Sequence, residues 1–138
     1  MSPREGVPLA PFTTFRIGGP ARFFIEATTE EEVEKARGEA ARHALPLIPL
    51  GGGSNILVSD EGVEGVVLKM ALRGIAFEKD GDDTLVVAGA GTPWEEVVDA
   101  TVAQGVFGIE NLAGIPGTIG GAAVQNIGAY GAELAGIF

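Results

Sequence analysis

Two glycine-rich segments constrain this 138-residue chain more than any other feature of its sequence. The first, at residues 51–55, reads GGGSN and directly follows the apolar run 45–50. The second, at residues 114–131, reads GIPGTIGGAAVQNIGAYG and holds six of the chain's 22 glycines. Because glycine accepts positive φ and lets a ligand approach backbone N–H groups closely, both segments indicate binding of a phosphate or of the edge of a flat cofactor.

Composition excludes several classes of protein. The length predicts one domain with a real core, and a net charge of −10 with nine dispersed basic residues argues against nucleic acid as a partner. The chain has no cysteine and a single histidine, His43, which excludes disulfides, a cysteine nucleophile and histidine- or thiolate-based metal sites. We expect His43 to be a solvent-facing residue in the last turn of a helix. No apolar stretch is long enough to span a bilayer, so a soluble, cytoplasmic protein is predicted.

Local patterns predict a strand–helix–strand unit near the amino terminus. The first 15 residues contain three prolines and are expected to be irregular. A strand is predicted over 21–27, a Thr-x-x-Glu capping box at 29–32 begins a helix, and a short strand follows at 47–50. Such a unit favours parallel strands and places the first glycine loop at a strand's carboxyl end, where α/β folds bind ligands. Residues 1–58 are therefore predicted to form a first subdomain.

The rest of the chain, residues 59–138, predicts a second subdomain that is apparently truncated. Short strands are expected at 65–70, 75–79 and 84–88, separated by turn residues that favour an antiparallel or mixed sheet. A second helix is predicted to begin with Thr92 as its cap. The residues of this helix expected to face a core are Trp94, Val97, Val98 and Val102, with Gly105 as the C-cap. The predicted fold class is α+β, with a small parallel βαβ unit and a mixed or antiparallel sheet with helices.

Taken alone, the GGGSN segment fits a flexible turn as well as a binding loop. No Walker lysine follows it, and the spacing and acidic residue of a Rossmann fingerprint are missing. Tyr130 is consistent with either a core aromatic or a ligand contact. Arg16 and Arg22 flank a glycine turn and could meet a phosphate, although surface ion pairs are the simpler interpretation.

Four motifs in order carry a resemblance to a known family. They are TFRIGGPA at 14–21, GGGSNILV at 51–58, NLAGIPGTIGGA at 111–122 and QNIGAYGAE at 125–133. Together they resemble the amino-terminal part of the UDP-N-acetylenolpyruvoylglucosamine reductase (MurB) family, within the PCMH-type FAD-binding fold. The resemblance extends from about Thr14 to the end of the chain.

This resemblance implies a noncovalently bound FAD. It places the first glycine loop around the pyrophosphate and the later glycine segment near the ribityl chain and isoalloxazine. The residues that it implies for FAD binding are Leu50, Gly51, Gly52, Gly53, Ser54, Asn55, Ile56, Gly89, Ala90, Gly114, Ile115, Pro116, Gly117, Thr118, Gly120, Gly121, Ala122, Gln125, Asn126, Gly128, Ala129 and Tyr130. In so acidic a protein, backbone dipoles rather than lysines are expected to hold the diphosphate.

The resemblance also implies a reaction, in which NADPH reduces the enolpyruvyl ether of UDP-N-acetylglucosamine to UDP-N-acetylmuramate for peptidoglycan precursor synthesis. Hydride passes through the flavin, and a general acid then protonates the substrate. The family's Tyr-Arg segment, proton-donating Ser, late Glu and substrate-binding domain have no counterpart before Phe138, so no catalytic residue is assigned. We therefore expect the FAD-binding portion of a reductase, inactive by itself. Another PCMH-type FAD oxidoreductase and a noncatalytic nucleotide-binding module remain as alternatives.

Overall fold

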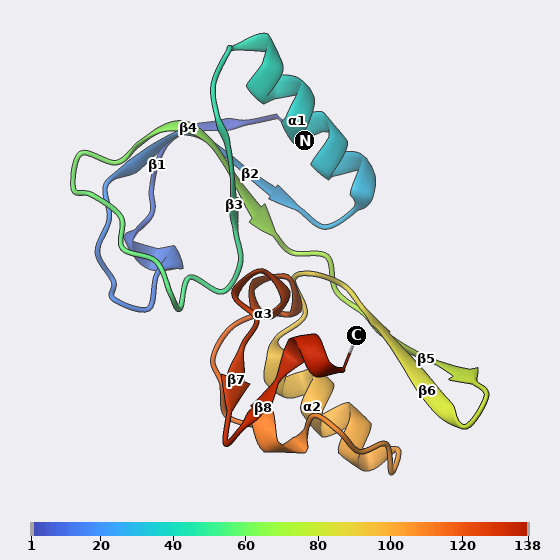
Figure 1. Ribbon diagram of the computed structural model, residues 1–138. Coiled ribbons are helices and arrows are strands. Elements are labelled where there is room, and N and C mark those ends of the chain that lie inside the picture. The colour runs from blue at the N-terminus through green and yellow to red at the C-terminus, as the bar shows by residue number, and fades with distance from the viewer. Residues whose placement is uncertain (1, 138) are drawn as a thin grey trace. The chain divides into compact units, whose positions relative to one another are not determined.

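The computed structural model describes residues 2–137. The chain divides into two compact units, Met1–Leu72 and Arg73–Phe138. We call these the first and the second unit. Both contain strands and helices (Figure 1), in agreement with the predicted α+β class. The division falls at residue 72 rather than at the predicted residue 58, because the strand at 63–70 belongs to the sheet of the first unit.

The first unit is built on a four-stranded sheet with the order β1-β2-β4-β3. Its strands are β1 (Arg4–Pro8), β2 (Pro20–Ala27), β3 (Leu47–Leu50) and β4 (Val63–Met70). β1 runs antiparallel to β2, whereas β4 runs parallel to both β2 and β3. The two strands of the predicted strand–helix–strand unit are thus parallel, but β4 lies between them.

Proline marks both edges of this sheet. The expectation that the first 15 residues are irregular is wrong in part, since β1 pairs with β2 and is followed by the 3₁₀ turn η1 (Ala10–Phe12). Pro8 ends β1, and Pro49 lies within β3, the other edge strand. Edge strands tolerate proline because its missing N–H can face away from the neighbouring strand.

Helix α1 (Glu30–Arg42) begins as the sequence predicts. The Thr29 hydroxyl oxygen accepts a hydrogen bond from the Glu32 N–H at 3.3 Å, while the Glu32 carboxylate accepts one from the Thr28 N–H at 2.8 Å. In a capping box the Glu carboxylate accepts from the N–H of the N-cap residue. Here it accepts instead from the N–H of Thr28, the residue before the N-cap. His43 caps the other end of the helix and is partly exposed, with its ring 4.7 Å from that of Phe23.

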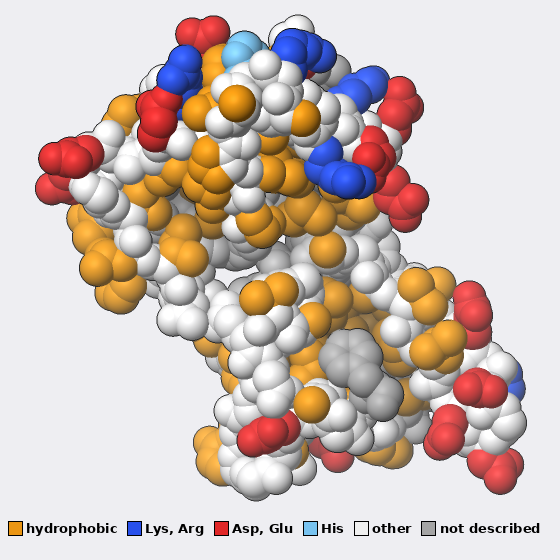
Figure 2. Space-filling model, turned by 45° about the horizontal axis from the view of Figure 1, so that its top comes forward, with side chains coloured by type: hydrophobic (Ala, Val, Ile, Leu, Met, Phe, Trp, Pro, Cys, Tyr) orange, Lys and Arg blue, Asp and Glu red, His pale blue; other side chains and the backbone are white. Residues whose placement is uncertain are grey.

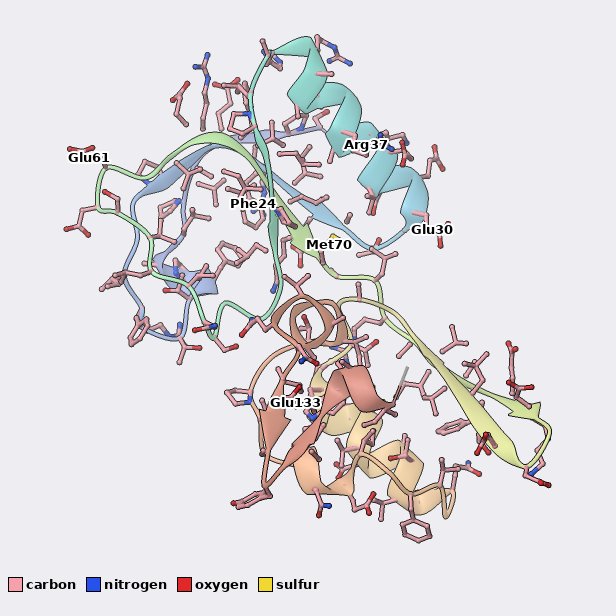
Figure 3. The ribbon with its side chains drawn as sticks, viewed as in Figure 1. Phe24, Glu30, Arg37, Glu61, Met70 and Glu133 are labelled. Carbon is pink, nitrogen blue, oxygen red and sulfur yellow. The ribbon has the colours of Figure 1, made fainter. Side chains whose placement is uncertain are left out.

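Apolar side chains bury both faces of the sheet. On one face, Ala36 and Ala40 of α1 pack with Phe23, Val66 and Leu68. On the other, the fully buried Phe24 (Figure 3) lies 4.6 Å from the ring of Phe12 in η1, and Leu50 and Val67 join the same cluster. Leu50 is the last residue of β3, so the first glycine loop directly follows a residue of this second cluster.

The second unit contains a hairpin and a set of short elements. The hairpin is formed by β5 (Ile75–Asp80) and β6 (Asp83–Ala88), antiparallel as predicted. The other elements are α2 (Trp94–Ala103), η2 (Glu110–Leu112), α3 (Ile119–Gln125), β7 (Gly128–Ala129), β8 (Ala132–Glu133) and η3 (Leu134–Gly136). Sequence analysis did not predict α3, because its glycines and alanines carry little amphipathic pattern.

The start of α2 differs from the prediction. Pro93, not Thr92, occupies the N-cap position, and the helix has no side-chain cap. The Thr92 hydroxyl instead donates to the Gly74 carbonyl oxygen and accepts from the Gly74 N–H, both at 3.2 Å. The local pattern predicted that the Thr92 hydroxyl caps α2, but this hydroxyl is bonded to Gly74, which lies 18 residues earlier in the chain.

The buried face of α2 is nearly as predicted. Trp94, Val97 and Val98 are buried, but the expectation for Val102 is wrong, since its side chain is 48% exposed. The helix ends at Ala103 with Gln104 as its C-cap, so the predicted C-cap at Gly105 is displaced by one residue. Gly105 follows with φ +69°, and the Val106 N–H donates to the Thr101 carbonyl oxygen at 2.9 Å, as in a helix end that a glycine terminates. Within residues 2–137, every helix is too short or too polar to reach across a membrane.

Candidate functional site

The first glycine loop is held closely against the segment that follows η1. Gly53 has φ +70°, and a Cβ atom on it would lie 1.9 Å from the carbonyl oxygen of Phe12. The Thr14 N–H donates to the Gly53 carbonyl oxygen at 3.0 Å. The loop conformation therefore depends on glycine at this position, both for its φ and for the close approach.

A lysine also contacts this loop. The Lys69 ammonium of β4 donates a hydrogen bond to the carbonyl oxygen of Gly51, and partial burial lowers the pKa of Lys69, against the opposing effect of the Glu26 carboxylate. Sequence analysis missed Lys69, because only the pairing of β4 with β3 brings it beside the loop. A lysine near the end of the apolar run VVLKM was the signal that could have drawn attention to it.

The other predicted residues of this loop differ in what they expose. Leu50 is buried in the core and Ile56 packs against the same cluster, so each could offer a ligand its backbone rather than its side chain. Gly52 and Asn55 are exposed, and Ser54 is partly exposed.

In the second unit, the structure brings two of the predicted segments together. The Gly120 N–H donates to the Ala90 carbonyl oxygen at 2.9 Å, and a Cβ atom on Gly120 would lie 3.1 Å from that of Ala90. Next to this contact, the Trp94 N–H donates to the Gly117 carbonyl oxygen at 3.1 Å. The turn that begins at Gly89 and the start of α3 thus form one backbone cradle, in which a larger residue at Gly120 would crowd Ala90.

Thr118 lies within this cradle and is 7% exposed. It is the N-cap residue of α3, yet its hydroxyl makes no capping bond. Among the described residues, its Oγ1 is the one buried side-chain oxygen or nitrogen without a hydrogen-bond partner. A buried hydroxyl without a partner costs about 1–3 kcal/mol, so a ligand that supplies one would recover that energy. Gly121 and Ala122 follow in the first turn of α3, and Ala122 is buried.

The end of α3 is fixed by Asn126, which has φ +46°. Its side-chain amide donates to the Glu133 carboxylate at 3.0 Å, and its carbonyl oxygen accepts from the Ala135 N–H at 2.8 Å. Both the nitrogen and the oxygen of the Asn126 side chain are therefore bonded within the protein. Among the residues predicted to bind FAD, Asn126 thus has a structural role. Glu133 is labelled on β8 in Figure 3, and the exposed Gln125 precedes Asn126.

Strand β7 and its turn carry the last predicted residues. Gly128 approaches β8 closely, since a Cβ atom on it would lie 3.0 Å from the Ala132 carbonyl oxygen. After Ala129, the turn residues Tyr130 and Gly131 have φ +53° and +83°. The Tyr130 side chain is 95% exposed, so the structure excludes a core role for it. An exposed aromatic residue held in the left-handed region is an outlier of the kind that gathers at ligand sites.

The segment before Thr118 is anchored mainly by its backbone. The Gly114 N–H donates to the Glu95 carboxylate at 2.7 Å, and Ile115 packs against the cluster that contains Trp94. Pro116 is exposed. The Trp94 indole N–H donates to the buried Leu112 carbonyl oxygen at 2.8 Å, which ties this segment to α2.

Charge is distributed unevenly between the units. Arg73 and Lys79 are the basic residues of the second unit, and Figure 2 shows the blue side chains gathered over the first. Arg22 forms an ion pair with Glu64, which confirms the simpler interpretation of that residue. Within residues 2–137, no cluster of three or more His, Asp or Glu side chains is placed to hold a metal ion.

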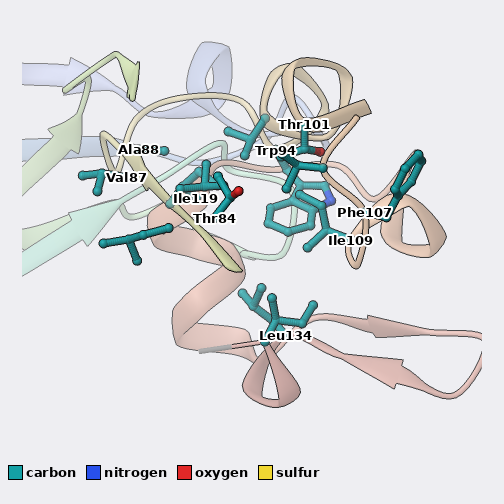
Figure 4. A pocket seen from close by; sticks show the side chains of 14 residues that line it. Thr84, Val87, Ala88, Trp94, Thr101, Phe107, Ile109, Ile119 and Leu134 are labelled. Atoms are coloured by element: carbon teal, nitrogen blue, oxygen red, sulfur yellow. The ribbon is translucent and has the colours of Figure 1, made fainter. Parts of the chain in front are cut away.

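A cavity of about 480 Å³ lies between β6, α2 and η3 in the second unit (Figure 4). Its lining is apolar except for Thr84 and Thr101, and the Thr101 hydroxyl already donates to the Val98 carbonyl oxygen at 2.8 Å. Sequence analysis did not predict this cavity. Because so few polar groups could orient a ligand there, we assign no ligand to this cavity.

Comparisons with known proteins identify an FAD-binding family and relatives that share one name. A family described as "FAD binding domain" matches residues 21–138. UDP-N-acetylenolpyruvoylglucosamine reductase from Saccharopolyspora erythraea is 47% identical over 134 residues, covering 96% of this chain and 37% of that protein. The reductase from Pseudomonas putida is 43% identical over 136 residues, covering 98% of this chain and 40% of that protein.

A solved structure gives the same result. The crystal structure of UDP-N-acetylenolpyruvylglucosamine reductase (MurB) from Thermus caldophilus aligns with a TM-score of 0.74 and 34% identity, over 97% of this chain and 46% of that one. The chain thus has the fold of an FAD-binding domain and spans 37–40% of the length of the two curated relatives named above.

Proposed function

The chain belongs to the family of FAD-binding domains, and on that premise we propose that it is the flavin-binding part of a reductase acting on a UDP-sugar. The proposed reaction is the NADPH-dependent reduction of UDP-N-acetylglucosamine enolpyruvate to UDP-N-acetylmuramate. The names of the relatives, at 43% and 47% identity, support this reaction. Bound FAD would supply hydride transfer between the nicotinamide and the substrate.

The observation that carries the proposal is the buried, unpartnered hydroxyl of Thr118. It lies in a cradle of closely approaching backbone between Ala90 and Gly120, as the edge of a flat, heteroatom-rich ligand would require. We propose that Thr118 hydrogen-bonds FAD there.

The remaining proposed contacts fall into two sets. In the first unit they are Leu50, Gly51, Gly52, Gly53, Ser54, Asn55 and Ile56, whose backbone N–H groups suit a diphosphate. In the second unit they are Gly89, Ala90, Gly114, Ile115, Pro116, Gly117, Gly120, Gly121, Ala122, Gln125, Gly128, Ala129 and Tyr130. Asn126 would support this set through its bonds to Glu133 and Ala135.

The first test measures FAD affinity in the whole protein in which this sequence occurs. Thr118→Val removes the unpartnered hydroxyl at nearly constant volume, and we expect FAD affinity to fall about tenfold, as for the loss of one buried hydrogen bond. Thr101→Val is the matched control, since that hydroxyl is bonded within α2. A Thr118→Val protein that binds FAD as well as the parent would remove Thr118 from the site.

The second test separates the reductase from the alternatives. We expect NADPH to bleach the visible bands of bound flavin, and the enolpyruvyl UDP-sugar to restore them under anaerobic conditions. Bound flavin that NADPH does not reduce would favour a noncatalytic nucleotide-binding module. Turnover of an unrelated alcohol alone would favour another FAD oxidoreductase of the same superfamily. We also propose a cytoplasmic location, where cell fractionation should find the protein.

A further inference from the structure

We propose that Lys69 is a positioning residue of the first glycine loop, holding the Gly51 carbonyl so that the N–H of Gly52 is presented to the diphosphate of FAD. The inference rests on the proposed function, because it names how one element of that binding site is oriented. It assigns a role to a lysine where the sequence predicted backbone dipoles alone.

The sheet register puts Lys69 beside the loop. On the central strand β4, Lys69 pairs with Leu50 of β3 on one side and with Glu26 of β2 on the other. Leu50 is the last residue of β3, so the loop begins directly next to Lys69. Val67, two residues earlier, faces the cluster opposite α1, and strand alternation puts the Lys69 side chain on the same face.

The hydrogen bond fixes the direction of one peptide group. Lys69 donates to the carbonyl oxygen of Gly51, and the peptide between Gly51 and Gly52 is trans. In a trans peptide, the C=O and N–H bonds point in opposite directions. Holding the oxygen toward the Lys69 ammonium therefore turns the Gly52 N–H away from that ammonium, and Gly52 itself is exposed.

A second bond holds another carbonyl group of the loop, two residues later. The Thr14 N–H donates to the Gly53 carbonyl oxygen at 3.0 Å, which fixes the plane of the peptide between Gly53 and Ser54. The loop is thus oriented through its carbonyl groups. Fixed donors of this kind are what an anion site requires, since they need no rearrangement when the ligand binds.

The charge of Lys69 adds to the effect of its position. An ammonium bonded to a carbonyl polarises the peptide and makes the N–H at its other end a stronger donor. A glutamine could hold the same oxygen without a charge, and an apolar residue would fill the space without burying any charge. Partial burial makes the Lys69 ammonium costly to keep, and the Glu26 carboxylate beside it offsets only part of that cost, which favours a role in the site over a merely structural tie.

The test compares two flavins in the whole protein. FAD carries the diphosphate and riboflavin does not, so a defect at the diphosphate loop should affect FAD alone. We expect Lys69→Met to weaken FAD binding about tenfold or more and leave riboflavin affinity unchanged. Lys69→Arg should restore most of the FAD affinity. Lys35→Met is the matched control, because Lys35 is an exposed lysine of the same unit that pairs with Glu31 at 2.9 Å.

The outcomes separate this inference from the proposed function. A parent protein that binds neither flavin overturns both. A parent that binds FAD, with Lys69→Met unchanged or weakened equally for both flavins, overturns the positioning role and leaves the proposed function standing. Thermal unfolding of the flavin-free proteins checks the fold. If Lys69→Met is unfolded, Lys69→Ala, which also lacks a donor for the Gly51 carbonyl oxygen, is measured against Lys69→Arg with the same two flavins and the same outcomes.

Discussion

Replacing Gly53 by alanine should destabilise the first unit, because two independent features of the loop depend on glycine at that position. The residue has φ +70°, where alanine costs about 1–2 kcal/mol. The new Cβ atom would also lie 1.9 Å from the Phe12 carbonyl oxygen, far inside van der Waals contact. The clash is with backbone, so no side-chain rotation relieves it, and the loop itself must move.

The movement would break the hydrogen bond from the Thr14 N–H to the Gly53 carbonyl oxygen, which is worth about 1 kcal/mol. Together with the strain in φ, we expect the free energy of unfolding to fall by about 2–4 kcal/mol. FAD affinity should fall as well, since the loop that is proposed to hold the diphosphate is displaced.

Gly38→Ala is the matched control for this experiment. Gly38 lies on the exposed side of α1, where an added Cβ meets no atom within 4 Å. In this helix position, alanine should stabilise the protein by about 0.5–1 kcal/mol. Urea unfolding followed by circular dichroism measures both variants. A Gly53→Ala protein as stable as the parent, or two variants that shift in the same direction, would refute the reasoning.

Three further predictions use other contacts of the chain. Trp94→Phe should lower stability by about 1–3 kcal/mol in urea unfolding, because the buried Leu112 carbonyl oxygen loses its donor; no loss would show that this bond contributes nothing. Tyr130→Asn should raise stability by up to about 1 kcal/mol, since asparagine tolerates its positive φ, while FAD affinity falls; unchanged affinity would remove Tyr130 from the proposed site. Hydrogen bonds from Thr28 lower the pKa of Glu32, so its stabilisation is present above the unfolded pKa and is lost as the pH falls through the folded one. Glu32→Gln should therefore flatten the acid side of a plot of Tm against pH, and an unchanged acid slope would contradict this.

Local signals were sufficient for much of the fold. The capping box at Thr29 and the turn residues between β5 and β6 act on neighbouring residues, so their patterns in the sequence identify the elements directly. The places of β1 and β4 in the sheet could not be predicted from local signals. Their positions depend on pairing with β2 across long stretches of chain, and no local pattern specifies that pairing.

At the candidate site, the sequence predicts the glycine runs but not what contacts them. Glycine runs show where the backbone can approach a ligand, and the cradle between Ala90 and Gly120 joins two of them. What the sequence could not show was how side chains from other elements engage these loops. Thr92 serves Gly74 rather than α2, and Lys69 reaches Gly51 only through the register of β4.

The prolines in β1 and β3 have a consequence beyond the sheet in which they lie. The two strands at its borders each lack an amide donor, at Pro8 and at Pro49. A border strand with a complete set of donors is a template for aggregation, because a second molecule can add its own strand there. Each proline interrupts that row of donors and so disfavours the addition of strands from further molecules. Replacing Pro49 by valine would supply the missing donor next to the first glycine loop, in a β-branched residue that favours extended structure.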